Sequence, residues 1–134
     1  MAASGPWRAS AGATLLMPSG NEGAHLFIVL NDPRPFEGYG KNPCVVLVNL
    51  SSVRMDVPYD ATCLLAPGDH PFVTRTSFVY YRNARIEPES HVLQLTQLGL
   101  FKSHEPMPAD VLLRIKAGLY QSPHTKREFK RMKL

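Results

Sequence analysis

A succession of short apolar runs, separated by loops, constrains the fold of this chain more than any other feature. Two of the runs, His25–Leu30 and Cys44–Leu50, are continuous, as expected for buried strands. Shorter strand-like runs follow at Thr62–Leu65, Phe72–Val73, Ser77–Tyr81 and Asn83–Ile86. Because loops rather than helices separate these runs, the pattern favours an antiparallel meander that closes into a small barrel over a parallel βαβ fold.

One helix is predicted from about Pro108 to Gln121. Proline suits the first helical turn, and a stripe of apolar residues then recurs with helical spacing, at Val111, Leu112, Ile115 and Leu119. The pair Ser122-Pro123 ends the helix. Residues 89–100 fit either a short helix or an edge strand. The predicted class is therefore mainly β with a C-terminal α-helix.

The length of 134 residues suits a single domain with a core of its own. Residues 1–22 are rich in Ala, Ser, Gly and Pro and are expected to form an irregular lead-in. Residues 23–121 form the predicted barrel domain with its helix, and residues 122–134 form a basic tail.

The net charge of +4 is concentrated in this tail, since residues 126–134 contain five basic side chains and one acidic. Such a segment neutralises phosphates and speeds association with nucleic acid, or is simply a solvated chain end. On the first reading, four of its residues contact the substrate: Lys126, Arg127, Lys130 and Arg131.

Cys44 and Cys63 lie within apolar runs, and no Cys or His stands at metal-ligand spacing from them. Buried thiols in a reducing compartment are therefore expected, with a disulfide or a catalytic thiol as alternatives. No apolar run approaches the roughly 20 residues that cross a bilayer, and the N-terminus lacks the pattern of a secretory signal. We expect a cytoplasmic protein with no membrane partner, no metal and no cofactor.

Candidate site residues are the polar side chains next to the apolar runs, where barrel strands meet their loops. Metal-free cleavage of RNA needs an acid or base and a cation that stabilises the charged phosphorane. Histidine suits proton transfer because its ordinary pKa is near 6.5. The predicted catalytic residues are His25, Ser51, Ser52, His70 and Arg75, with Asn49 and Ser77 as substrate contacts. The alternatives are that His70 and Asp69 only stabilise their turn and that His25 is an exposed edge residue.

Three segments resemble the PemK/MazF-type toxin family: His25–Asp32, Val45–Ser52 with its final hydroxyl pair, and Gly68–Phe72 leading into Thr76–Val79. The resemblance covers about residues 23–121 and implies an SH3-like barrel that acts as a sequence-selective endoribonuclease. It also implies that Ser51 or Ser52 contacts the scissile phosphate, that the chain forms a homodimer, and that a small antitoxin occupies the RNA groove. Family toxins usually carry Arg-Pro where this chain has Ala24-His25, so His25 or Arg75 would take the part of that arginine.

A second hypothesis is a non-catalytic SH3-like module that binds protein or nucleic acid. Aromatic residues expected at the surface support it, because aromatic rings beside basic groups stack on bases or grip a peptide: Phe36, Tyr39, Tyr80 and Tyr81. A third is an accessory protein that acts only through a partner. Of these, a metal-independent endoribonuclease that binds single-stranded RNA is the leading expectation.

Overall fold

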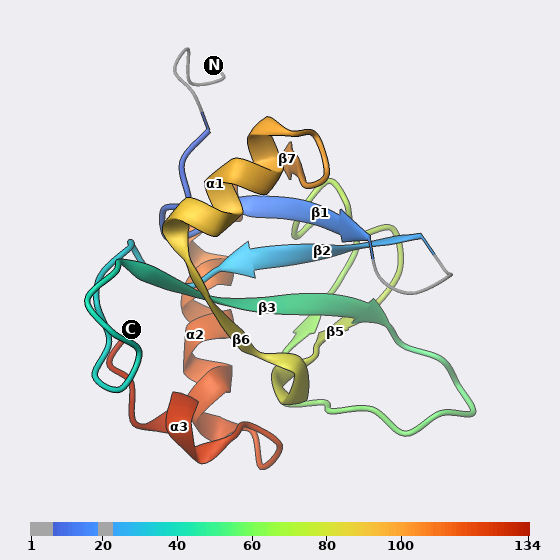
Figure 1. The fold of residues 1–134 in the computed structure, drawn as a ribbon. Helices are drawn as coiled ribbons and strands as arrows, with labels where there is room; N and C mark the ends of the chain where they lie inside the picture. The colour runs from blue at the N-terminus through green and yellow to red at the C-terminus, as the bar shows by residue number, and fades with distance from the viewer. Residues whose placement is uncertain (1–6, 19–22) are drawn as a thin grey trace.

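A computed structural model describes residues 7–18 and 23–134 and shows a mixed α/β fold (Figure 1). An antiparallel sheet of seven strands has the order β4-β5-β3-β2-β1-β7, and β6 pairs with β3 off this path. The strands are β1 (Thr14–Pro18), β2 (Ala24–Val29), β3 (Cys44–Ser52), β4 (Leu64–Leu65), β5 (Ser77–Val79), β6 (Arg85–Pro88) and β7 (Lys102–His104). The helices are α1 (Glu89–Gln97), α2 (Ala109–Gln121), α3 (Arg127–Lys130) and the short 3₁₀ helix η1 (Tyr81–Asn83).

The predicted antiparallel sheet with a C-terminal helix is confirmed. The two long apolar runs form β2 and β3, and α2 begins directly after Pro108 and ends at Gln121. Residues 89–100, which fitted two structures, contain the helix α1. None of the helices in the described ranges is long and apolar enough to span a membrane.

Two local predictions were wrong, and one strand was not predicted. The lead-in was expected to be irregular, but β1 lies within it and pairs with both β2 and β7. Phe72 lies in a turn rather than in an extended run. Strand β7 was not predicted at all, since Lys102–His104 has no apolar pattern. Short strands such as β1 and β7 depend on the neighbour that supplies their hydrogen bonds, so their own residues signal them weakly.

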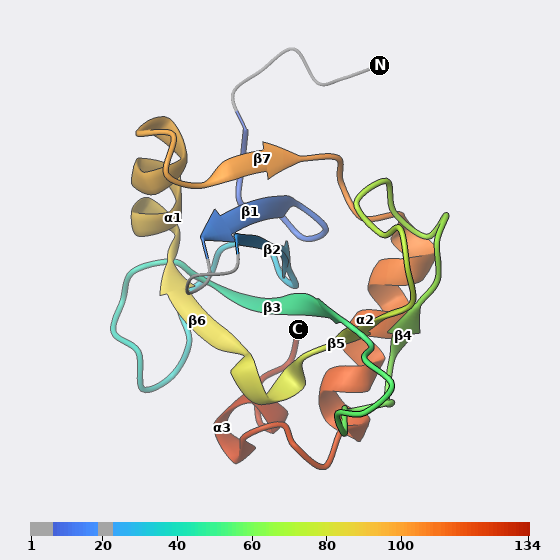
Figure 2. The same ribbon diagram turned by 90° about the vertical axis from the view of Figure 1, so that its right-hand side faces the viewer.

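Helices α1 and α2 cover opposite sides of the sheet (Figure 2). One apolar cluster joins alternate residues of β2 and β3, such as Ile28 and Val48, to Ile115 of α2. The other joins the intervening residues, such as Val29 and Leu47, to Val92 of α1. A strand covered on both faces has little need for polar residues, which explains why β2 and β3 are continuous apolar runs.

The C-terminal segment packs on the body of the protein. Phe129 and Met132 are buried in the cluster that contains α2, and the hydroxyl of Tyr120 donates to the carbonyl of Met132 at 2.5 Å. The basic residues of this segment therefore project from an ordered surface.

The sheet is not closed into a barrel by hydrogen bonds in the part of the chain that the structure describes, because β4 and β7, at the two ends of the strand order, do not pair with each other. Side-chain contacts link these ends instead. Nε2 of His70, in the turn after β4, lies 2.6 Å from the carbonyl oxygen of Glu105, directly after β7. The rings of His70 and His104 are 5.1 Å apart between centroids.

Both cysteines are buried and free, as predicted. Burial raises the pKa of the Cys44 and Cys63 thiols, so the reactive thiolate form is disfavoured at neutral pH. These thiols therefore act as small apolar residues of the core.

Candidate functional site

Two adjoining cavities share four lining residues: His25, Ser51, Ser52 and Arg54. The larger has a volume of about 420 Å³, within the range of ligand sites, and the smaller about 230 Å³. The larger is also lined by Val57, Pro58, Tyr59, Asp60, Phe78, Tyr80, Arg82 and His124, and the smaller by Ala24, Leu50, Phe72 and Ser77. We call this continuous surface the groove.

Neighbouring strands assemble the floor of the groove. Phe27 of β2 pairs with Asn49 of β3, so the same register, continued by two residues, sets His25 beside Ser51. Ser51 in turn pairs with Phe78 of β5. Directly paired residues of an antiparallel sheet project on the same face, so these side chains form one surface although they are far apart in the sequence.

Three aromatic rings form a row along the groove. The ring of Tyr59, in the loop after β3, lies 5.6 Å from that of Phe78, and Phe78 lies 5.4 Å from Tyr80. Tyr80 is held at its backbone, where its N–H donates to the carbonyl of Asn49 at 2.8 Å. The row offers flat apolar surface for stacking.

Asp60 fixes the loop that carries Tyr59. Its Oδ1 accepts from the backbone N–H of Thr62 at 2.9 Å and from its hydroxyl at 2.5 Å, and its Oδ2 accepts from the hydroxyl of Ser122 at 2.5 Å. Burial alone would raise the pKa of Asp60, but the hydrogen bonds from Ser122 and Thr62 outweigh it and hold the pKa below its ordinary value. The side chain is therefore an ionised carboxylate at neutral pH.

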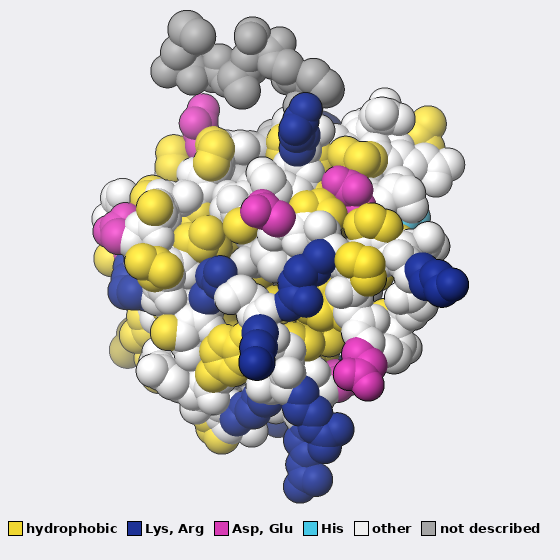
Figure 3. Space-filling view, turned by 90° about the vertical axis from the view of Figure 1, so that its left-hand side faces the viewer, with side chains coloured by type: hydrophobic (Ala, Val, Ile, Leu, Met, Phe, Trp, Pro, Cys, Tyr) yellow, Lys and Arg dark blue, Asp and Glu magenta, His cyan; other side chains and the backbone are white. Residues whose placement is uncertain are grey.

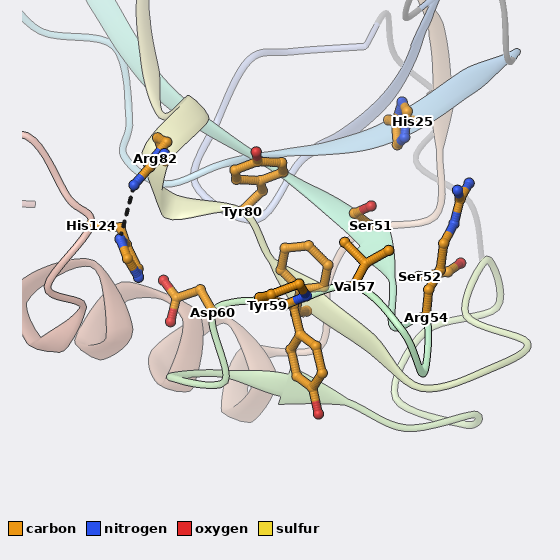
Figure 4. A pocket seen from close by; sticks show the side chains of 12 residues that line it. His25, Ser51, Ser52, Arg54, Val57, Tyr59, Asp60, Tyr80, Arg82 and His124 are labelled. Atoms are coloured by element: carbon orange, nitrogen blue, oxygen red, sulfur yellow. Dashed lines mark hydrogen bonds between the residues drawn. The ribbon is translucent and has the colours of Figure 1, made fainter.

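Arg82 and His124 lie at one end of the larger cavity, and His25 lies at the other end above Arg54 (Figure 4). Nη2 of Arg82 is 3.3 Å from Nδ1 of His124, whose backbone N–H donates to the hydroxyl of Ser122 at 3.1 Å. The same serine thus anchors both Asp60 and His124.

His25 is half-buried, and its Nδ1 atom is buried without a hydrogen-bond partner among the described residues. Buried nitrogens are usually paired, and unpaired ones are found at catalytic sites among other places. No described contact at Nδ1 selects one tautomer, so the ring is free to hold its proton on either nitrogen.

The structure does not bring His70 into the groove. Its side chain is 1 % exposed, its Nδ1 accepts from the N–H of Phe72 at 3.0 Å, and its Nε2 donates to Glu105. Both ring nitrogens of this buried histidine are therefore occupied by backbone groups, and His70 lines neither cavity. These contacts favour the structural alternative for His70 over its predicted catalytic role.

Asp69 stabilises the same turn. Its Oδ2 accepts from the N–H of Ala66 at 2.8 Å and from the guanidinium of Arg114 at 3.2 Å. These contacts tie the turn after β4 to α2.

Some of the other predicted site residues line the groove, and others do not. Ser51 and Ser52 line the groove, and the buried Ser77 lines its smaller cavity. Asn49 is buried and lines neither cavity, and Arg75 is exposed and lines neither. Of the aromatic residues expected at the surface, Phe36 and Tyr81 are instead buried.

The four basic residues of the tail are exposed but lie outside both cavities: Lys126, Arg127, Lys130 and Arg131. Figure 3 shows Lys and Arg side chains spread over the face that carries the C-terminal segment. Any contact of these residues with an anionic ligand would therefore be outside the groove.

Sequence reasoning missed Arg54, Tyr59 and Asp60, although their loop directly follows the hydroxyl pair Ser51-Ser52 and was the natural place to look. It also missed Arg82 and His124, which are 42 residues apart and meet only through folding. No group of three or more His, Cys, Asp or Glu in the described ranges could hold a metal ion.

Comparisons with family models, with curated proteins and with solved structures give no significant match. The likeness to the PemK/MazF-type toxins therefore rests on the sequence segments alone.

Proposed function

We propose that this chain binds single-stranded RNA in the groove and cleaves it without a metal ion. One observation carries the proposal: a histidine, two serine hydroxyls and an arginine line the surface that both cavities share, namely His25, Ser51, Ser52 and Arg54. RNA cleavage by the ribose 2′-hydroxyl, which attacks the adjacent phosphodiester, requires groups of these kinds.

In this reaction His25 takes the proton of the 2′-hydroxyl, and the 2′-oxygen forms a bond to phosphorus. The bond from phosphorus to the 5′-oxygen then breaks, which leaves a 2′,3′-cyclic phosphate and a 5′-hydroxyl. The leaving oxygen takes its proton from water, which reaches the groove beside the exposed Ser52. Arg54 stabilises the charge of the phosphorane, and the serine hydroxyls donate to its oxygens.

The aromatic row and the basic tail suit the same ligand. Bases of a single strand stack on rings such as Tyr59 and Tyr80 without strong sequence preference. The exposed cations of residues 126–131 attract the phosphate backbone and raise the association rate.

The resemblance to PemK/MazF-type toxins agrees with this function and adds the finer expectations. It implies that the open sheet is a variant of the SH3-like barrel, that two copies form a dimer, and that an antitoxin blocks the groove. An RNA substrate also implies that the protein acts in the cytoplasm.

A second candidate is a non-catalytic RNA-binding module. It is favoured because the aromatic row is complete, whereas only one of the two predicted proton carriers, His25, lines the groove. The two candidates differ only in whether bound RNA is cut.

The test is to incubate the purified protein with end-labelled single-stranded RNA in EDTA. The wild-type protein is expected to produce fragments that end in a 2′,3′-cyclic phosphate. The variant His25→Ala is expected to cut about 100-fold more slowly or worse, the usual effect of losing a general base. His91→Ala is the matched control, because His91 is exposed on α1 and lines neither cavity.

Binding without cleavage by the wild-type protein would replace the first candidate by the second. Equal cleavage by wild type and His25→Ala would remove His25 from the mechanism. Absence of both binding and cleavage would overturn both candidates.

A further inference from the structure

We propose that the Arg82 end of the groove is a subsite for a guanine base; the inference rests on the proposed binding of RNA. The subsite consists of Arg82, His124, Asp60 and the neighbouring ring of Tyr80, which line one end of the larger cavity.

The hydrogen-bond donors come from Arg82 and His124. A guanidinium only donates, so Nδ1 of His124, 3.3 Å from Nη2 of Arg82, acts as the acceptor. The proton of the neutral imidazole is then on Nε2. The remaining N–H groups of Arg82 and the Nε2–H of His124 are therefore available to acceptors on a ligand.

The acceptor is Asp60. Its carboxylate receives three hydrogen bonds, two from Thr62 and one from Ser122. A carboxylate offers about four acceptor positions, so one remains for a ligand. The three existing bonds also fix the orientation of the carboxylate, so a ligand loses no binding free energy in ordering it.

An aromatic ring lies next to these polar groups. Figure 4 shows Tyr80 beside Arg82. A flat base that stacks on Tyr80 would have its edge near the polar groups. Stacking thus supplies affinity, and the edge contacts supply selectivity.

The charge of the lining residues indicates that a base, rather than a phosphate, occupies the Arg82 end of the groove. Among the residues that the structure describes, Asp60 is the only acidic one that lines either cavity, and it lies at the Arg82 end, where it would repel a phosphate. At the His25 end the described lining residues include no carboxylate, so we place the phosphate of the proposed reaction there. The Arg82 end has both hydrogen-bond donors and a carboxylate acceptor, so it suits a neutral ligand with donors and acceptors of its own.

Guanine is the base that matches this set. Its N7 and O6 are adjacent acceptors that arginine binds in the commonest specific base contact. Its N1–H or its amino group can donate to the one acceptor position that remains on Asp60. Adenine presents a donor in place of O6 and would face the guanidinium with the wrong group.

The test measures binding of labelled hexanucleotides with 2′-O-methyl riboses, which cannot react by 2′-hydroxyl attack. One holds a single guanine among uracils, one an adenine and one a 7-deazaguanine at the same place. The wild-type protein is expected to bind the guanine oligomer about tenfold more tightly than the adenine one, as one good bidentate contact gives. The 7-deaza compound, which lacks N7, is expected to lose most of this preference.

Arg82→Ala is expected to abolish the preference for guanine and to leave binding of the adenine oligomer nearly unchanged. Lys102→Ala is the matched control, because Lys102 is exposed on β7 and lines neither cavity. If the wild-type protein binds all three oligomers equally, or if Arg82→Ala weakens all of them equally, the guanine subsite is wrong while RNA binding stands. If it binds none of them, and no unmodified RNA either, the proposed function itself fails.

Discussion

His70 donates a hydrogen bond from Nε2 to the backbone carbonyl of Glu105 at 2.6 Å and so links the two open ends of the sheet. The same carbonyl accepts from the hydroxyl of Thr14 at 2.7 Å, which adds β1 to the junction. The position of the imidazole is fixed from the other side by the N–H of Phe72. A residue that looked suited to catalysis therefore stabilises the fold.

The variant His70→Ala is expected to lose about 2 kcal/mol of unfolding free energy, because it leaves the partly buried N–H of Phe72 without its acceptor and removes a bond to Glu105. Urea unfolding followed by circular dichroism measures the change. The exposed His91→Ala is the control and is expected to stay within about 0.5 kcal/mol of wild type. Unchanged stability of His70→Ala would contradict the structural role.

Stability is expected to fall in acid because of the same residue. Burial, the largest effect, lowers the pKa of His70 below its ordinary value of 6.5, and nearby His104 lowers it further, while the hydrogen bond to Glu105 partly offsets both. Below about pH 6.5 the unfolded chain therefore takes up a proton that the folded protein resists. The stabilisation is complete above that pH and is lost as the pH falls through the lower, folded-state pKa.

This dependence is measured as unfolding free energy between pH 7.5 and pH 5 for wild type and for His70→Gln. The glutamine variant is expected to be less stable at pH 7.5 but to lose less on acidification, since it cannot take up the proton. Parallel pH profiles for the two proteins would count against His70 as the source.

Gly118→Ala is expected to loosen the contact of α2 with the sheet. A Cβ at this position would lie 2.7 Å from Cζ of Tyr81 and would overlap its hydroxyl oxygen. That ring is fully buried, and its hydroxyl donates to the carbonyl of Ile115 at 2.7 Å, so it has no easy way to move. The expected cost is about 1 to 3 kcal/mol of unfolding free energy, typical of overpacking.

Thermal and urea unfolding of Gly118→Ala, compared with Gln121→Ala on the exposed side of the same helix, measure this effect. In an exposed helix, alanine in place of glycine would stabilise by up to about 1 kcal/mol. A more stable Gly118→Ala protein would therefore show that Tyr81 does not occupy this space.

Tyr80→Ala is expected to weaken binding of single-stranded RNA by about 1 to 3 kcal/mol, the usual contribution of one stacked base. Tyr80→Phe is the matched control, because it keeps the ring that contacts Phe78 and removes only the hydroxyl. Fluorescence anisotropy with labelled RNA measures both. Equal losses in the two variants would show that the hydroxyl, rather than stacking, binds the ligand.

Elements whose pattern lies within their own residues were predicted from the sequence, whereas elements that depend on distant residues were not. The runs at β2 and β3 and the helix α2 carry their own periodicity, so their positions were predicted within one or two residues. Strand β7 owes its structure to pairing with β1 and left no pattern of its own. The hydroxyls Ser51 and Ser52 were singled out because a strand end is visible in sequence, whereas Arg82 and His124 were missed because they are 42 residues apart and no local pattern links them.

The sequence by itself determined the antiparallel character of the sheet, its C-terminal helix, the buried thiols and the basic chain end, because each follows from hydrophobic periodicity or from charge along the chain. Only the tertiary structure decided which polar residues share a surface. His25 and His70 look equivalent in sequence, since each adjoins an apolar run. Strand register carries His25 to the groove beside Ser51, while the closing of the sheet ends buries His70 against Glu105. Register and closure depend on pairings across the whole fold, and no short stretch of sequence contains them.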